Sequence, residues 1–155
     1  MDFYGVGTVF GGKTDNEIEK LNEFLENDIW CMGYSDVERP KYAELIKQIK
    51  VGDIIIAKSY KLDATYFVKA LGIVIDTKKP ENIAEEFRTK SGVSVIWFKR
   101  FKPYIQLSKD DFKVGGNRTH TIYQEKNERN ISVIKKIMKC DYTTKTVEII
   151  PKNSI

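Results

Sequence analysis

Two short polar segments carry side chains that could bind an anion or the edge and face of a heteroaromatic ring. Lys58-Ser59-Tyr60 ends an apolar stretch, and Asn117-Arg118-Thr119-His120 follows two glycines. An ammonium group binds phosphate oxygens, and a guanidinium can do so through two parallel N–H groups. A hydroxyl can pair with the polar edge of a base, and a tyrosine ring can stack on its face. The alternative interpretations are an exposed strand end and a polar hairpin tip.

The residues of most catalytic and metal sites are scarce in this chain. It has two cysteines, Cys31 and Cys140, and one histidine, His120, which are too few for a disulfide framework or a complete zinc site. Neither a Gly-x-Ser-x-Gly elbow, a P-loop, an HExxH sequence nor a dinucleotide fingerprint occurs. We therefore predict no catalytic residue, no metal and no cofactor, and we expect both thiols to be reduced.

The charge is distributed unevenly along the chain. Residues 1–79 hold eleven Lys and Arg against thirteen Asp and Glu, whereas residues 80–155 hold fifteen against nine. The net charge of +4 therefore arises from the second half. A basic half of this kind attracts polyanions such as nucleic acids, although a solvated lysine-rich face would have the same composition.

Four segments are predicted to form the short helices that position these side chains. Thr14-Asp15-Asn16-Glu17 has the spacing of a capping box, and Ile18, Leu21 and Leu25 follow at helical spacing, so the first helix should end near Asn27. The other three are predicted over residues 42–49, from Pro80 at a first helical position through Phe87, and from an Asn130 cap through Met138.

Short apolar stretches between these helices predict strands. They run over Phe3–Phe10, Ile54–Lys58, Tyr66–Ile75, Val93–Phe98, Tyr104–Leu107, Thr119–Tyr123 and Thr146–Ile150. Before the second of them, Gly52 should take a positive φ and Asp53 should accept hydrogen bonds from the turn amides. The spacing does not fit regular βαβ units. It predicts one α+β domain over residues 1–155, with a curved, mostly antiparallel sheet and helices packed around it.

Residues 30–75 contain a recognisable order of motifs. Trp30-Cys31-Met32-Gly33-Tyr34 precedes a short helix, Ile49–Ser59 reads IKVGDIIIAKS, and Val68–Val74 reads VKALGIV. This order resembles the PUA-like superfamily, and it is most similar to EVE-type domains and to the N-terminal modules of modification-dependent restriction proteins. The resemblance implies a PUA-like or EVE-like curved antiparallel β-barrel with short helices around it.

EVE-type and related YTH domains hold a modified base in an aromatic pocket, and the resemblance implies such a pocket here. Trp30 is the first choice for a stacking face, because it follows the first helix and precedes Gly33; a position in the core is the alternative. Trp97 lies in an apolar strand and is predicted to be core. The predicted ligand-binding residues are Tyr4, Val6, Trp30, Gly33, Lys58, Ser59 and Tyr60, and the predicted contacts to the nucleic-acid backbone are Lys99, Arg100, Lys102, Asn117 and Arg118.

The sequence thus favours a module that binds DNA or RNA and recognises a modified or flipped base. Two alternatives remain. ASCH proteins share the superfold and include hydrolases of small amides with a Lys/Thr/Glu group, in which Lys58 or Lys69 could supply the lysine for a nucleoside-type amide. A protein-interaction module of a defence or RNA-modification system could instead use the acidic first helix. Family members are often fused to nucleases or AAA+ proteins, so a separate effector of that kind is an expected partner. Neither a membrane span nor a signal peptide is evident, which predicts a cytoplasmic protein.

Overall fold

A computed structural model describes residues 1–11, 16–139 and 147–149 of the chain. Its strands are β1 (Phe3–Val6), β2 (Val9–Phe10), β3 (Ile18–Glu19), β4 (Ile29–Cys31), β5 (Ile54–Tyr60), β6 (Tyr66–Asp76), β7 (Gly92–Leu107), β8 (Ile122–Glu125) and β9 (Val147–Ile149). Its helices are α1 (Leu21–Asn27), α2 (Pro40–Ile46), α3 (Glu85–Arg88) and α4 (Glu128–Met138), with a 3₁₀ turn at Gly116–Thr119. The architecture is α+β, as the sequence predicts.

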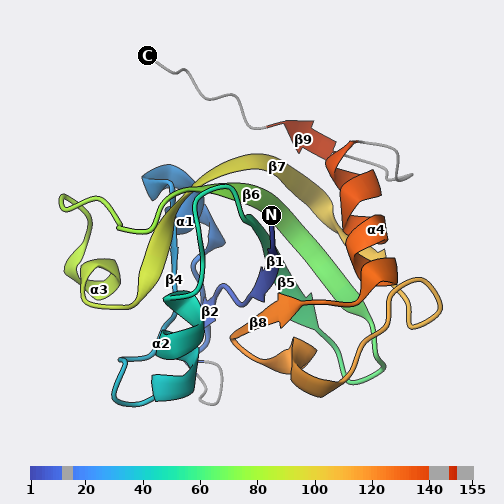
Figure 1. The fold of residues 1–155 in the computed structure, drawn as a ribbon, viewed down its shortest axis with the longest axis horizontal. Coiled ribbons are helices and arrows are strands. Elements are labelled where there is room, and N and C mark those ends of the chain that lie inside the picture. Colours follow the sequence, from blue (N-terminus) through green and yellow to red (C-terminus); the bar gives the residue numbers. More distant parts are fainter. Residues whose placement is uncertain (12–15, 140–146, 150–155) are drawn as a thin grey trace.

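The main sheet curls into a half-barrel with the strand order β4-β7-β6-β5-β1-β8, and β9 pairs with β7 (Figure 1). All neighbouring strands are antiparallel except β1 and β5, which are parallel with Phe3 opposite Ile54 and Val6 opposite Ala57. The long connection through α1 and α2 makes this parallel pair feasible, because parallel neighbours require a crossover. As a result, the carboxyl ends of β1 and β5 lie at the same edge of the sheet.

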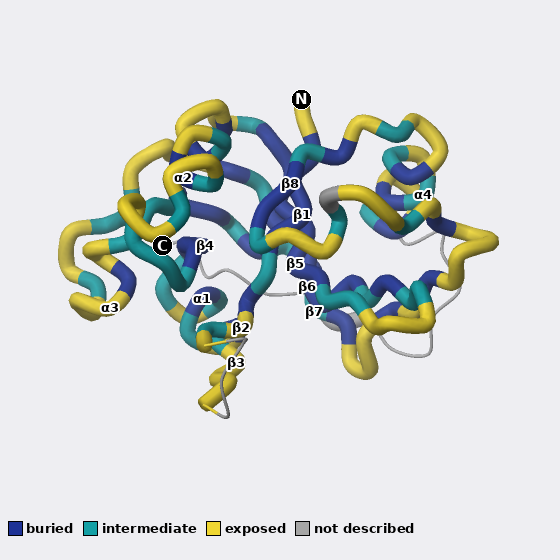
Figure 2. Tube along the Cα trace, turned by 90° about the horizontal axis from the view of Figure 1, so that it is seen from below, coloured by how far each residue is buried: buried dark blue, intermediate teal, exposed yellow. Residues whose placement is uncertain are grey.

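The sheet is buried on both faces. Along β5, Ile55 and Ala57 belong to a cluster that includes residues of α1, α2 and α3, whereas Ile54 and Ile56 belong to a second cluster that includes residues of α4. This division follows from the alternation of side chains along a strand. The central strands are buried and the connecting loops are exposed in Figure 2. A buried sheet leaves the loops at the strand ends as the places where a ligand can reach the protein.

The turn before β5 has the predicted geometry. Gly52 has a φ of +95°, and the Asp53 carboxylate accepts hydrogen bonds from the amides of Lys50 (2.8 Å) and Asp2 (2.9 Å). The second bond ties the beginning of β1 to the beginning of β5, because Ile54 also donates its amide hydrogen to the carbonyl of Asp2. The prediction for this turn is confirmed.

The predicted beginning of the first helix is wrong. Ile18 and Glu19 form β3, which pairs with β2 through Val9 opposite Glu19 and Phe10 opposite Ile18, and α1 begins only at Leu21. Part of the expected capping box lies outside the described residues. Helical spacing of apolar residues did not reveal that a neighbouring strand would pair with this segment.

Other boundaries also differ from the prediction. The strand expected from Thr119 begins only at Ile122, because Thr119 ends the 3₁₀ turn, and the strand expected over Phe3–Phe10 is divided into β1 and β2. The third helix, α3, is limited to Glu85–Arg88, and the fourth is capped by Asn127 rather than Asn130. The Asn127 side chain accepts a hydrogen bond from the Asn130 amide, and Asn130 is itself buried inside α4. The two strands predicted between residues 93 and 107 are one continuous strand, β7.

Candidate functional site

A polar pocket opens where β1 and β5 end side by side. We call it the β5-end pocket. It has a volume of about 310 Å³, and its lining residues are Gly7, Thr8, Val9, Glu17, Lys58, Ser59, Tyr60, Lys69, Thr119, His120 and Thr121. The parallel pairing of β1 with β5 brings residues 7–9 and 58–60 together, and a hydrogen bond from the Gly7 amide to the Thr121 carbonyl (2.8 Å) brings in residues 119–121. With Glu17 and Lys69, five separate parts of the chain thus meet at one opening.

Lys58 is a buried ammonium at this pocket. Its side chain follows an irregularity in the β5–β6 pairing after Ala57, and the residue is only 5% exposed. The Nζ atom donates a hydrogen bond to the carbonyl of His120 and lies 5.8 Å from the centre of the Tyr123 ring. Burial, with a smaller contribution from the charge of Lys69, lowers the pKa of Lys58 to about 8. An ammonium with one carbonyl partner has N–H groups left to donate to a ligand.

Lys69, Thr8 and Glu19 form a connected polar group beside Lys58. The Lys69 Nζ donates to the Thr8 Oγ1 (3.0 Å) and to the Glu19 Oε1 (2.6 Å), and the Thr8 hydroxyl donates to the Glu19 Oε2 (2.6 Å). Pairing of β3 with β2 holds Glu19 in this position. Burial raises the pKa of the Glu19 carboxyl, but the hydrogen bonds from Lys69 and Thr8 and the Lys69 charge outweigh it and leave the pKa below its ordinary value. The carboxylate therefore stays ionised at neutral pH.

Two aromatic rings, Tyr60 and His120, line the pocket opening, and a third, Tyr104, lies beside one of its lysines. Tyr60 is half-buried, and His120 is exposed with its ring 5.8 Å from the ring of Tyr42 on α2. Tyr104 lies on the Lys69 side, where its ring centre is 5.5 Å from the Lys69 Nζ. These rings provide stacking faces at the edge of the pocket rather than an enclosed aromatic cage.

The structure brings three of the predicted ligand-binding residues together, Lys58, Ser59 and Tyr60, and excludes the others from this pocket. Trp30 is fully buried in β4, where its indole N–H donates to the Gly7 carbonyl (2.8 Å). This corrects its expected position outside a strand: the indole is bonded to the segment after β1 and exposes no face to a ligand. Tyr4 and Val6 are also core residues, and Gly33 lies against the ring of Phe10. Trp97 is core, as predicted.

Most of the expected contacts to a nucleic-acid backbone also need correction. Arg118 donates two hydrogen bonds to the buried Glu125 carboxylate (3.0 and 2.6 Å), and Lys99 donates to the carbonyls of Ile137 and Met138 at the end of α4. Arg100 donates to the Asn22 side chain (2.5 Å). These three cations therefore already donate hydrogen bonds to acceptors within the protein. Lys102 is exposed, and the side chain of Asn117 lies outside the described part of the structure.

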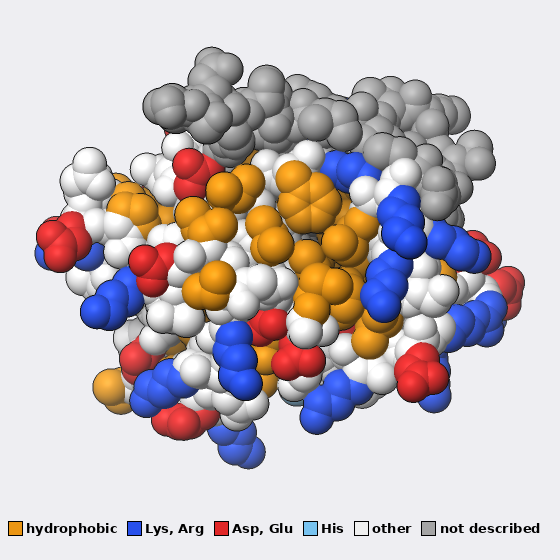
Figure 3. Space-filling model, turned by 45° about the horizontal axis from the view of Figure 1, so that its top comes forward, with side chains coloured by type: hydrophobic (Ala, Val, Ile, Leu, Met, Phe, Trp, Pro, Cys, Tyr) orange, Lys and Arg blue, Asp and Glu red, His pale blue; other side chains and the backbone are white. Residues whose placement is uncertain are grey.

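The described side chains of the face shown in Figure 3 do not present a continuous basic surface that could replace these expected contacts to a nucleic-acid backbone. Hydrophobic side chains gather in the middle of this face, and Lys and Arg are interspersed with Asp and Glu around them. Several Lys and Arg side chains lie next to one another to the right of the hydrophobic ones, and Asp and Glu side chains interrupt the basic surface elsewhere on this face. A long strand of nucleic acid would need a more uniform basic path.

Thr8 and Glu19 were missed by the sequence reasoning. Thr8 follows a strand without any motif, and Glu19 has the spacing of a residue on the outer face of the first helix. The sequence pointed to this group only through Lys69, which was considered as the lysine of an ASCH-like hydrolase. Within the described residues, no cluster of three or more His, Cys, Asp or Glu side chains has a geometry that could hold a metal ion. The longest helix of the same residues, α4, has 11 residues, and none is long and apolar enough to span a membrane.

Comparison with known proteins identifies the fold. No protein-family model matches the sequence, and no curated protein sequence matches it. A solved structure does match: the crystal structure of the Pho92 YTH domain in complex with m6A has a TM-score of 0.53, with 12% sequence identity, over 96% of this chain and 88% of that chain. The likeness shows a fold related to that of a YTH domain.

Proposed function

We propose that this chain is a nucleic-acid-binding module that takes one unpaired, modified base into the β5-end pocket. The observation that carries the proposal is the convergence of Lys58, Ser59 and Tyr60 with the residues before β8 around one polar opening. Its volume of about 310 Å³ lies at the lower end of the range for ligand sites, which suits a single ring rather than an extended ligand. The YTH domain of the same fold was solved with m6A, which supports a base as the ligand.

The pocket residues would have distinct roles. The Lys58 ammonium would donate to a carbonyl or ring-nitrogen acceptor on the base edge, and the Ser59 hydroxyl would read a neighbouring donor or acceptor. Tyr60 and His120 would stack on the base from the edge of the pocket, which is the role that was predicted for Trp30. One such stacking contact is worth roughly 1–3 kcal/mol.

The family resemblance adds two expectations. Modules of this kind act beside a nuclease or an AAA+ protein, so we propose a separate effector of that type as the partner. We also propose a cytoplasmic location, in which such a module meets DNA and RNA.

The experiment is a binding titration by fluorescence anisotropy. Labelled single-stranded RNA and DNA are compared, each with adenine or N6-methyladenine and with cytosine or 5-methylcytosine at one position. The wild type should bind one modified oligonucleotide at least tenfold more tightly than its unmodified form. Tyr60→Ala should lose about tenfold in affinity, and Lys58→Met should reduce the preference between bases.

Matched control variants are Tyr34→Ala and Lys61→Met, which change a tyrosine and a lysine outside the pocket. Both should leave the preference unchanged. Equal binding of modified and unmodified oligonucleotides by the wild type would reject the base-recognition proposal. If the Tyr60 and Tyr34 variants lose affinity equally, the base does not enter this pocket.

A second candidate function is hydrolysis of a nucleoside-type amide, favoured by the contact among Lys69, Thr8 and Glu19. The Thr8 oxygen would bond to the amide carbon, its proton would pass to Glu19 and then to the departing amine nitrogen, and the C–N bond would break. Water would then cleave the resulting ester and release the acid. We rank this candidate second, because Thr8 is fully buried and the lowered pKa of Glu19 makes it a weak base.

Incubation with an N-acylated nucleoside, followed by chromatography, tests the enzyme candidate directly. Hydrolysis by the wild type and its loss in Thr8→Val would support it. If the wild type releases no free nucleoside at high enzyme concentration, the candidate is rejected.

A further inference from the structure

A second, larger cavity lies between the end of α2 and the connection from β6 to β7. Its volume is about 630 Å³, twice that of the β5-end pocket. Its lining residues are Asp36, Ile46, Lys47, Ile49, Thr77, Lys78, Lys79, Pro80, Glu81, Arg88, Thr89, Lys90, Ser91 and Gly92. We call it the lysine pocket. None of its residues lines the β5-end pocket, so it is a separate feature of the surface.

Positive charge dominates the lysine pocket. Five of its lining residues are Lys or Arg, whereas only Asp36 and Glu81 are acidic. Asp36 accepts a hydrogen bond from the Ser91 hydroxyl (2.5 Å), and Lys47 forms an ion pair with Glu44. Among the described residues, the ion pairs do not include Lys78, Lys79, Arg88 or Lys90. Positive side chains therefore outnumber negative ones by three among the residues that line the pocket.

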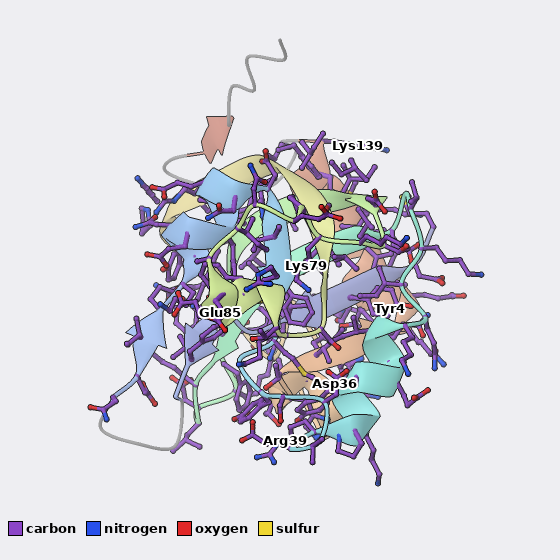
Figure 4. The ribbon with its side chains drawn as sticks, turned by 90° about the vertical axis from the view of Figure 1, so that its left-hand side faces the viewer. Tyr4, Asp36, Arg39, Lys79, Glu85 and Lys139 are labelled. Carbon is purple, nitrogen blue, oxygen red and sulfur yellow. The ribbon has the colours of Figure 1, made fainter. Side chains whose placement is uncertain are left out.

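Lys79 is held at this site rather than extended into solvent. It is half-buried, and its Nζ donates a hydrogen bond to the carbonyl of Lys90. Figure 4 views the molecule from the left-hand side of Figure 1, and Lys79 lies near the middle of this view, with Asp36 below it and Glu85 to its left. Burial lowers the pKa of the Lys79 ammonium, while the charge of the Asp36 carboxylate acts in the opposite direction. An anion in the pocket would relieve this desolvation of the ammonium.

The position of the lysine pocket relates it to the β5-end pocket. Tyr42 near the beginning of α2 contacts His120 at the β5-end pocket, and Ile46 at the end of α2 lines the lysine pocket. Four residues of helix span only about 6 Å along the axis. Both pockets therefore lie beside one short helix, α2, so that a strand held in one pocket can follow the helix to the other.

We propose that the lysine pocket binds phosphate groups, and that in the complex these belong to the strand whose base enters the β5-end pocket. The second part rests on the proposed function. Lys78, Lys79, Arg88 and Lys90 supply the charge, and the ammonium groups of the lysines and the guanidinium of Arg88 suit phosphate oxygens without reading sequence. The pocket thus fixes the strand while the β5-end pocket selects the base.

The test compares the double variant Lys79→Gln/Lys90→Gln with a matched control, Lys109→Gln/Lys113→Gln, which removes two exposed lysines elsewhere. The affinity for a labelled single-stranded oligonucleotide is measured at several salt concentrations. The pocket variant should bind about tenfold more weakly at low salt, and its salt slope should fall by about 1.4, since each phosphate contact on a single strand contributes about 0.7. The control should match the wild type. An unchanged slope in the pocket variant would overturn the assignment to the strand.

A second measurement separates a strand phosphate from a free one. Inorganic pyrophosphate is titrated into each protein by calorimetry, and the melting temperature confirms that all variants are folded. Binding by the wild type and the control, and its loss in the pocket variant, supports the phosphate site. If the wild type binds pyrophosphate but no oligonucleotide, the site stands and the nucleic-acid function fails. If all three proteins bind pyrophosphate equally, or none binds it, the phosphate site is rejected.

Discussion

Two buried groups in this protein pair a basic side chain with a glutamate, and they differ in their access to solvent. Around Glu125, the carboxylate accepts hydrogen bonds from Arg118, Tyr123, Asn127 and Asn130, and its side chain is fully buried. Around Glu19, the carboxylate pairs with Lys69 and Thr8 but keeps 37% of its side chain exposed. The first group is closed, whereas the second lies beside the β5-end pocket.

The difference shows why a basic residue cannot be assigned to ligand binding from its type alone. Arg118 has the fork that a phosphate needs, but the buried Glu125 already uses it. Lys58 and Lys69 are 5% and 3% exposed, no more than Arg118, yet they line an opening where a ligand can take up their remaining donors. A position at a pocket and the number of internal acceptors separate a candidate binding group from a structural cation.

The largest expected effect is at the closed group. Arg118→Met should lower the free energy of unfolding by about 3–5 kcal/mol, because it leaves the Glu125 carboxylate buried without its cation. Chemical denaturation monitored by fluorescence measures this change. The double variant Arg118→Met/Glu125→Gln, which removes both charges, should recover part of the loss. A cost below about 1 kcal/mol for Arg118→Met would remove the contrast between the two groups.

An intermediate effect is expected from the pH dependence of Lys58. Because burial lowers its pKa to about 8, the unfolded chain binds more protons than the folded one from about pH 8 to the ordinary lysine value near 10.4. The free energy of unfolding should therefore rise with pH in this window, by up to about 1.4 kcal/mol per pH unit, relative to Lys58→Met.

Denaturation of the wild type and Lys58→Met at pH 8 and pH 9.5 measures this difference, which should be about 1–2 kcal/mol. Arg118 gives no such dependence, because its hydrogen bonds to Glu125 raise the pKa of its guanidinium further above neutral pH. Parallel curves for the wild type and Lys58→Met would show that Lys58 is not desolvated.

The smallest effect on stability is expected at the open group. Lys69→Met should cost only about 1 kcal/mol of unfolding free energy, because the Glu19 carboxylate is partly exposed and water can replace the lost ammonium. The same variant should weaken oligonucleotide binding more than it weakens the fold, which paired denaturation and anisotropy measurements can compare. A loss of stability as large as that of Arg118→Met would make both groups structural.

Local sequence predicted the beginnings of β5 and β6 and the turn before β5, which depend on neighbouring residues, but it did not predict β3 or β4. The prediction for the Gly52-Asp53 turn was correct in detail, because the positive φ of the glycine and the hydrogen bonds of the aspartate involve residues close by in the sequence. The beginning of α1 was wrong, because pairing of β3 with β2 overrode the helical spacing of Ile18. Long-range pairing of this kind leaves no periodic signal in a single segment.

The candidate site could be predicted only in part. Lys58, Ser59 and Tyr60 were identified because they end a strong apolar strand, and strand ends reach solvent. Trp30 was placed wrongly, because an aromatic residue after a helix fits an exposed loop and a buried edge strand equally well. Thr8 and Glu19 gave no signal, since they meet Lys69 only after β1, β3 and β6 have assembled.

By itself, the sequence determined the α+β class, the strand that ends at Lys58 and the shape of the turn before it, because these depend on side-chain alternation and local backbone geometry. The tertiary structure decided which cations are free to bind a ligand. Burial and internal hydrogen bonding at each cation depend on residues that lie far away along the chain, and these meet only when the sheet curls.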